Sequence, residues 1–325
     1  MRTPSIPLAA AATIGALLTA ITPCVAQTCA ITNASGNYGS ANILTGSPVT
    51  TSTSFSVSCT GGNNRTVRLC IGFSYGVNYG GSTTQRIMSG ASNGLVHDLF
   101  IDPGYAQVWG APSIIGVAPY PGSILTYDLT LNNSGAGTTP ALPVYGQIYG
   151  GQQTAAPGGY TWTTGTPGVQ YGYNTGAPCP AGTRSAVAGT GTSVWVANVP
   201  AMCLLTTASL NFGSQGVLST AVDAQTSLSI RCTRTTPYTV ALSAGSGAGA
   251  TTTNRLMTGP SAATIGYALY RDAARTQNWG NSPGDIASGT GTGLAQNHMV
   301  YGRTPPQTTP APGAYSDTII VTVTY

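Results

Sequence analysis

The stretch "GAYSDTIIVTVTY", residues Gly313–Tyr325, has the pattern of a half-buried β-strand. Apolar residues take every second position near its end, and threonines take most of the positions between them. The apolar positions at period two are Ile319, Val321, Val323 and Tyr325. No charge follows Asp317, so nothing discourages this edge from pairing. The stretch therefore predicts pairing either inside its own fold or with a strand from a partner.

The composition of the chain favours strands and turns over helices. Only 6% of the 325 residues are charged; the eleven basic residues are all Arg and the seven acidic ones all Asp. The absence of Lys and Glu, together with 44 Gly and 22 Pro, disfavours helices. The net charge of +4 is too small and too scattered to predict a nucleic-acid partner. The length gives room for two domains.

The segment 1–26 has the pattern of a secretory signal peptide. Arg2 supplies the positive start, the apolar stretch 8–21 follows, and small residues precede Gln27. Cleavage before Cys24, as in a lipoprotein, is the alternative, which Pro23 disfavours. We therefore expect export, and the cysteines that remain are expected to form disulfides.

The chain contains the same domain twice. "RIMSG" at 86–90 is repeated as "RLMTG" at 255–259, and the segment 97–110 is repeated at 267–280. The offset from the first copy to the second is almost the same for both of these pairs. Such a nearly constant offset indicates duplication. With the leader at 1–26, we predict domains at 27–200 and 201–325.

Each copy reads as a β-sandwich. Short alternating runs are separated by Gly, Pro or Asn clusters, as in "SFSVSCT" and "YTVALSA". This spacing predicts an all-β fold of two tandem immunoglobulin-like sandwiches, because a parallel sheet would need helices between its strands.

The repeat also suggests how the cysteines pair. A pair of cysteines stands at the start of each copy, and the spacing within the pair is nearly the same in both copies. Two cysteines have no counterpart and would join each other. The expected disulfides are Cys29–Cys59, Cys203–Cys232 and Cys70–Cys179.

The second copy resembles a known family. "IGYALYRDAARTQNWGN" (265–281), "VYGRTPPQTTPAPGAYSDTIIVTVTY" (300–325) and the early cysteine pair are similar to the spore coat protein U domain, as found in Csu-type archaic chaperone–usher pili. The first copy matches less closely, most of all at 110–144. The resemblance implies an incomplete pilin domain at 201–325. A periplasmic pilus chaperone would donate the missing strand first. After passage to the outer-membrane usher, an adjacent pilin subunit would donate it instead.

An asymmetry between the copies agrees with this implication. About forty residues separate Tyr160 from Cys203, and they include the alternating run "TSVWVANV" at 192–199. Only ten residues follow Tyr315, the counterpart of Tyr160. We expect the first domain to complete itself, and the strand of Ile319, Val321, Val323 and Tyr325 to form a strand-acceptor edge. The short stretch before Cys29 offers no strand to donate.

A tandem pair of this kind resembles the tip adhesin subunit of such pili, carried through the periplasm to the cell surface. The alternative is a secreted spore-coat-like or matrix structural protein with two self-contained sandwiches. A duplicated shaft pilin is a weaker third interpretation, because a donor extension is not evident.

Extra apolar loops in the first copy are the candidate binding surface. The stretches 110–124, 71–83 and 162–180 are longer than their counterparts or have none. The resemblance implies hydrophobic loops that attach to abiotic or host surfaces and support biofilm formation. The candidate residues are Ile114, Ile115, Val117, Pro119, Tyr120, Phe73, Tyr75, Tyr79, Tyr171 and Tyr173. The alternatives are that these side chains cover the ends of the sandwich, or that the aromatic ones bind a sugar.

Catalysis has little support in the sequence. There are few acid–base pairs, and His97 and Asp98 would point to opposite faces of a strand. No GxSxG motif occurs, and no helix signal follows either Gly-rich run. No CxxC motif occurs, and His97 and His298 have no neighbours at metal-ligand spacing. We therefore expect neither an enzyme nor a bound cofactor or metal.

Overall fold

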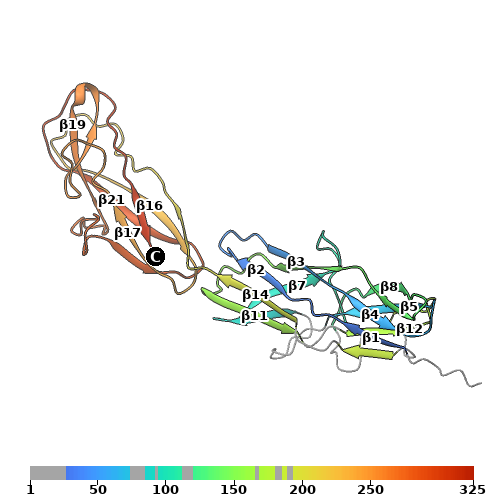
Figure 1. Ribbon diagram of the computed structural model, residues 1–325. Helices are drawn as coiled ribbons and strands as arrows, with labels where there is room; N and C mark the ends of the chain where they lie inside the picture. The colour runs from blue at the N-terminus through green and yellow to red at the C-terminus, as the bar shows by residue number, and fades with distance from the viewer. Residues whose placement is uncertain are drawn as a thin grey trace, which may run out of the picture.

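The computed structural model describes residues 27–73, 85–91, 94–111, 120–164, 168–179, 185–188 and 193–325. The expected leader lies outside these residues. Across them the elements are strands, apart from one 3-10 turn, Pro260–Ala262. Two elongated β-bodies follow each other along the chain and lie end to end (Figure 1). No helix in the described ranges has the length and apolar character needed to span a membrane.

Strand pairing divides the chain between β14 and β15, and the first body is a sandwich. Its elements are β1 (Thr28–Ile31), β2 (Gly36–Ser40), β3 (Val49–Phe55), β4 (Val57–Thr60), β5 (Thr66–Gly72), β6 (Arg86–Gly90), β7 (Leu95–Phe100), β8 (Leu125–Thr130), β9 (Ala136–Thr138), β10 (Leu142–Ile148), β11 (Gly158–Thr164), β12 (Gly168–Gly172), β13 (Ser185–Ala188) and β14 (Ser193–Val199). One sheet has the order β2-β14-β11-β6-β7-β10-β3; two smaller sheets have the orders β1-β4-β9 and β13-β12-β5-β8.

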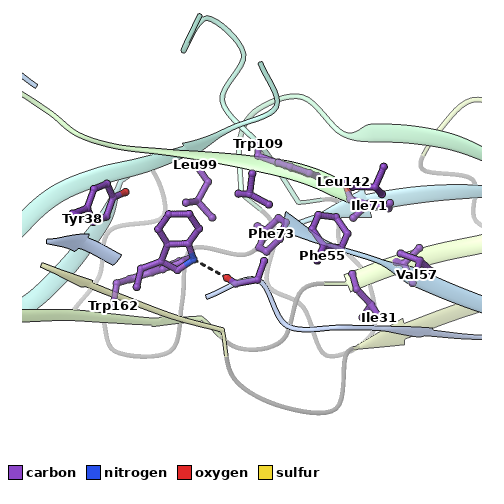
Figure 2. Close-up of a cluster of buried hydrophobic side chains, with 14 of the residues drawn as sticks. Ile31, Tyr38, Phe55, Val57, Ile71, Phe73, Leu99, Trp109, Leu142 and Trp162 are labelled. Atoms are coloured by element: carbon purple, nitrogen blue, oxygen red, sulfur yellow. Dashed lines mark hydrogen bonds between the residues drawn. The ribbon is translucent and has the colours of Figure 1, made fainter. Parts of the chain in front are cut away.

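Side chains from all three of these sheets meet in one core of thirty buried residues. Figure 2 shows Phe55, Phe73 and Trp109 gathered in its middle. The Phe73 ring lies 5.0 Å from the Trp109 ring and 5.7 Å from the Phe55 ring, in edge-to-face arrangements that aromatic pairs favour. Period-two burial along β14 and β10 places every second side chain in this core.

The second body has two sheets and a smaller core. Its elements are β15 (Cys203–Thr206), β16 (Val222–Cys232), β17 (Pro237–Leu242), β18 (Arg255–Thr258), β19 (Thr264–Tyr270), β20 (Ala287–Thr290), β21 (Gln296–Thr304) and β22 (Val321–Thr324). The sheet orders are β15-β16-β21-β19-β18 and β20-β17-β22. Only ten residues are buried in its core. A domain of this size with so little buried apolar surface is poorly stabilised by itself.

The internal repeat is visible as one bonding pattern made twice. The Trp109 Nε1 donates to the Ile71 carbonyl at 3.0 Å, and the Trp279 Nε1 donates to the Val240 carbonyl at 2.9 Å. A buried arginine in each domain then donates to the carbonyl of that tryptophan. The prediction of two copies of an all-β fold is confirmed.

The three predicted disulfides are confirmed. Two of them join the first strand of each domain to its antiparallel neighbour, β1 to β4 and β15 to β16. The third, Cys70–Cys179, ties the segment after β12 to β5.

Candidate strand-acceptor groove and surface-binding loops

The second domain has an open groove along one side. Residues 207–218 form one wall and residues 309–321 the other. The floor is apolar and includes Leu228, Leu269 and Val300. The groove has two adjoining compartments of about 520 and about 610 Å³.

The predicted acceptor residues lie at this groove to different degrees. Ile319 and Val321 line it, half-buried against the core. Val323 also packs against the core, whereas the side chain of Tyr325 is 58% exposed. β22 pairs with β17 along one edge, and no described strand pairs with its other edge.

The wall 207–217 makes no backbone–backbone hydrogen bond within the part of the chain that the structure describes. Its apolar side chains are also partly uncovered: Val217 is 75% exposed. A row of unpaired backbone N–H and C=O groups is the kind of edge to which another strand can add.

In the first domain the corresponding place is filled by β14. β14 lies between β2 and β11, parallel to β2 and antiparallel to β11 (Figure 1). Four of its side chains are buried: Ser193, Trp195, Ala197 and Val199. The predicted strand at 192–199 is thus confirmed as the element that completes the first sandwich.

A repeated motif shows that the two places correspond. "ASGNYGS" at 34–40 recurs without a gap as "ASLNFGS" at 208–214. The repeat is visible in the sequence, but its meaning depends on the place of β2 beside β14. The match equates β2 with the wall 210–214, and it equates Ile43, which is 3% exposed, with Val217.

The opposite wall corresponds in the same way. The Tyr160 hydroxyl donates to the Ala156 carbonyl at 2.8 Å, and the Tyr315 hydroxyl donates to the Ala311 carbonyl at 2.7 Å. Thr161 faces Ser89 in β6, and its counterpart Ser316 bridges to Thr258 in β18. β11 thus corresponds to residues 313–319, and the groove is the position of β14 left open.

One carboxylate lies in the groove. Asp317 accepts hydrogen bonds from the Ser246 N at 2.7 Å and from the Tyr267 hydroxyl at 2.8 Å. Burial would raise the pKa of Asp317, but these bonds and one from the Thr318 N hold it below its ordinary value. Asp317 is therefore ionised at neutral pH.

A buried polar cluster in the first domain includes Tyr120. The Arg86 guanidinium pairs with Asp98, and both side chains are almost fully buried. The Tyr120 hydroxyl donates to Asp98 at 2.9 Å, and its ring lies 3.9 Å from the Arg86 guanidinium. Ala111 and Tyr120 exchange backbone hydrogen bonds of 2.9 and 3.0 Å. Ala111 and Tyr120 are therefore held side by side.

His97 and Asp98 do not form a catalytic pair. Nδ1 of His97 lies 3.1 Å from the Tyr38 hydroxyl, and burial together with Arg86 lowers the pKa of His97 well below its ordinary value. The two side chains have different partners: His97 lies beside Tyr38, and Asp98 contacts Arg86 and Tyr120. Across the described ranges, no group of three or more His, Cys, Asp or Glu side chains could hold a metal ion.

Three of the predicted surface-binding residues are buried, and for them the prediction is wrong. Phe73 is covered by Trp109, Tyr120 reaches inward to Asp98, and Tyr171 sits in β12 with its side chain in the core. Aromatic side chains such as these are often buried in the core of a domain rather than exposed on its loops.

Tyr173 is half-buried rather than free. Its hydroxyl accepts a hydrogen bond from the Gly62 N at 2.6 Å, and the Arg65 guanidinium lies 4.3 Å from its ring. The remaining six candidates lie outside the described residues: Ile114, Ile115, Val117, Pro119, Tyr75 and Tyr79.

Comparison with known families places this architecture. The profile of the Spore Coat Protein U domain matches residues 16–165 and 190–322, which is most of the chain and one match for each copy. The chain belongs to the Spore Coat Protein U domain family. The resemblance stated from the sequence motifs is thereby confirmed.

Individual relatives of this Spore Coat Protein U domain chain are distant. Protein U of Myxococcus xanthus is 33% identical over 104 residues, which cover 30% of this chain and 58% of that protein. The chain thus spans a little over half the length of that relative.

A solved structure has a similar fold over most of the chain. It is a chain of the CsuC–CsuE chaperone–tip adhesion subunit pre-assembly complex from archaic chaperone-usher Csu pili of Acinetobacter baumannii, with a TM-score of 0.54 and 18% identity. The match covers 92% of this chain and 100% of that one, and it supports the fold. The CupB6 tip adhesin from Pseudomonas aeruginosa is more distant, with a TM-score of 0.34 and 12% identity over 91% of this chain and 93% of that one.

Proposed function

We propose that this protein is the tip adhesin subunit of an archaic chaperone–usher pilus. One observation carries the proposal: β14 completes the first domain, and the same position in the second domain is an open groove. A domain with one open strand position is suited to join a fibre, and a closed domain ahead of it is suited to bind something else. The fold shared with a chain of the Acinetobacter baumannii tip-subunit complex supports this assignment.

The groove would bind its partner by β-strand addition. Backbone groups of 209–217 would hydrogen-bond the incoming strand, and its alternate side chains would enter the two compartments. A periplasmic chaperone would supply the strand first. At the outer-membrane usher, the adjacent pilin subunit would replace it. The protein would then stand at the pilus tip on the cell surface.

Attachment would be the role of the first domain. We place it in the apolar loops, at Ile114, Ile115, Val117, Pro119, Tyr75 and Tyr79, with abiotic or host surfaces as the partner and biofilm formation as the outcome. The Arg86–Asp98–Tyr120 cluster includes Tyr120, the residue that directly follows 112–119 in the chain. This function is binding, without catalysis.

The pilus assignment is tested by periplasmic co-expression. Residues 27–325 are produced alone and together with a chaperone of this pilus class. We expect a higher yield with the chaperone, and a one-to-one complex of the two proteins. An equal yield of monomer with and without the chaperone, with no complex between them, would contradict the proposal. That result would favour the secreted coat-like or matrix protein.

The adhesive loop is tested in assembled pili. Ile114→Asp with Ile115→Asp is expected to abolish adhesion to polystyrene, because two charges would have to be desolvated at the contact. Leu294→Asp is the matched control, since Leu294 is 59% exposed and lies in the second domain. Unchanged adhesion by the loop variant, at equal pilus density, would refute this assignment.

A further inference from the structure

The strand that completes the second domain must differ from β14 at one position. In the first domain that position is Trp195, whose side chain is fully buried and whose Nε1 donates to the Ala34 carbonyl at 3.0 Å. Two glycines make room for the indole ring. A Cβ on Gly36 or on Gly146 would overlap it.

The second domain keeps only one of these two glycines. Gly302 corresponds to Gly146, because "VYG" at 144–146 recurs at 300–302. Gly36, however, corresponds to Leu210 in the repeated motif. A Cβ on Gly302 would lie 3.0 Å from the Leu210 methyl carbons. The Leu210 side chain therefore lies over Gly302, where the Trp195 ring lies over Gly146.

The surroundings of this position are otherwise alike. Phe212 corresponds to Tyr38, and its ring lies 6.0 Å from that of Tyr267. The Tyr38 ring lies 6.0 Å from the ring of His97, which is the counterpart of Tyr267. In both pairs the two ring planes are steeply inclined to each other. The leucine has thus taken the place of the indole in a frame that the two domains share.

The facing wall has changed as well. Trp195 is opposite Trp162 in the β11–β14 ladder, and the counterpart of Trp162 is Asp317. A large aromatic side chain brought in here would collide with Leu210 and strip water from the Asp317 carboxylate, which is costly for an ionised group.

We infer that the second domain accepts a strand with a small residue, Gly, Ala or Ser, at the position of Trp195. This inference rests on the proposed function and specifies its partner. The strand runs parallel to 209–214 and antiparallel to 313–319, as β14 does in the first domain. Positions equivalent to Ser193 and Val199 face Ile319 and Gly313, which line the two compartments. Larger apolar side chains belong there.

A size exchange between Leu210 and the strand tests the inference. Residues 27–325 are extended through a Gly/Ser linker by a copy of residues 193–199. The copy either keeps Trp195 or carries Trp195→Ala. Each copy is joined to the wild-type chain and to the Leu210→Gly variant, which restores the residue found at Gly36. Leu210→Ala is a second, milder variant in case Leu210→Gly does not fold.

The readout is amide hydrogen exchange of the wall 209–217. In the wild-type chain, the copy with Trp195→Ala should slow exchange by about tenfold or more, and the copy with tryptophan should slow it less. In the Leu210→Gly chain the disadvantage of the tryptophan copy should shrink, because only Asp317 still opposes it. A copy with Asp at its four inward positions is the control and should give no protection in either chain.

The outcomes separate the two proposals. If both copies protect the wall equally in both chains, the groove takes a strand but the size rule is wrong. If no copy protects the wall in any chain, the groove does not accept strands, and both the size rule and the proposed function fall.

Discussion

Trp195→Ala should destabilise the first domain more than other single changes in β14. The Trp195 side chain is fully buried, and truncation of such a tryptophan costs about 3–5 kcal/mol. The change also removes the hydrogen bond to the Ala34 carbonyl, and an unsatisfied buried group adds about 1 kcal/mol. Because Gly36 and Gly146 have no side chain to fill the cavity, we expect the upper end, about 5 kcal/mol.

Urea unfolding of residues 27–325 with disulfides intact measures this loss. Tryptophan fluorescence reports mainly on the first domain, since only Trp279 lies in the second. With a slope of about 2 kcal/mol per molar urea, the midpoint should fall by about 2.5 M. Asn198→Ala, at an exposed position of the same strand, is the control and should shift it little. A loss below about 1 kcal/mol for Trp195→Ala would refute the claim that β14 completes this domain.

Three further outcomes are expected. Asp98→Ala should cost the first domain about 3–5 kcal/mol in urea unfolding, because it leaves the Arg86 charge buried without its carboxylate; a loss as small as that of a surface substitution would contradict the ion pair. Replacing Cys70 and Cys179 together by Ser should cost about 2–4 kcal/mol, since their bond closes a 109-residue loop, and an unchanged midpoint would show that the bond constrains little. The folded-state pKa of Asp317 lies below its ordinary value of 3.8, so its ionised form stabilises the second domain above about pH 4, and this stability is lost as pH falls through the lower value. Asp317→Asn should therefore reduce the loss of stability of the second domain between about pH 5 and pH 2, measured by amide hydrogen exchange. The same pH profile in the variant and the wild-type chain would contradict this role.

Features that depend on pattern could be predicted from the sequence. The alternation in "TSVWVANV" identifies β14, and the matching spacing of Cys29–Cys59 and Cys203–Cys232 identifies two disulfides. Both signals are carried by residues close in sequence or repeated at a fixed offset, so no knowledge of packing is needed.

Features that depend on packing could not. An apolar residue in a loop can be exposed or buried, so its type does not predict which. Phe73 and Tyr120 are buried because Trp109 and Asp98 lie beside them in space. Nothing near Tyr120 in sequence announces Asp98 as its partner. The repeat shows that Leu210 stands where the first copy has Gly36. The consequence of this difference for the groove follows only from the position of Trp195 in the structure.

The most direct test of the account compares backbone exchange at corresponding segments of the two domains. Hydrogen exchange is followed in residues 27–325 at low micromolar concentration, without a partner. We predict strong protection of 36–41 and 158–164, which β14 covers, and rapid exchange of 209–217, which no described strand covers. Equal protection of 36–41 and 209–217 would mean that the second domain is closed, and it would contradict the strand-acceptor groove on which the proposed function rests.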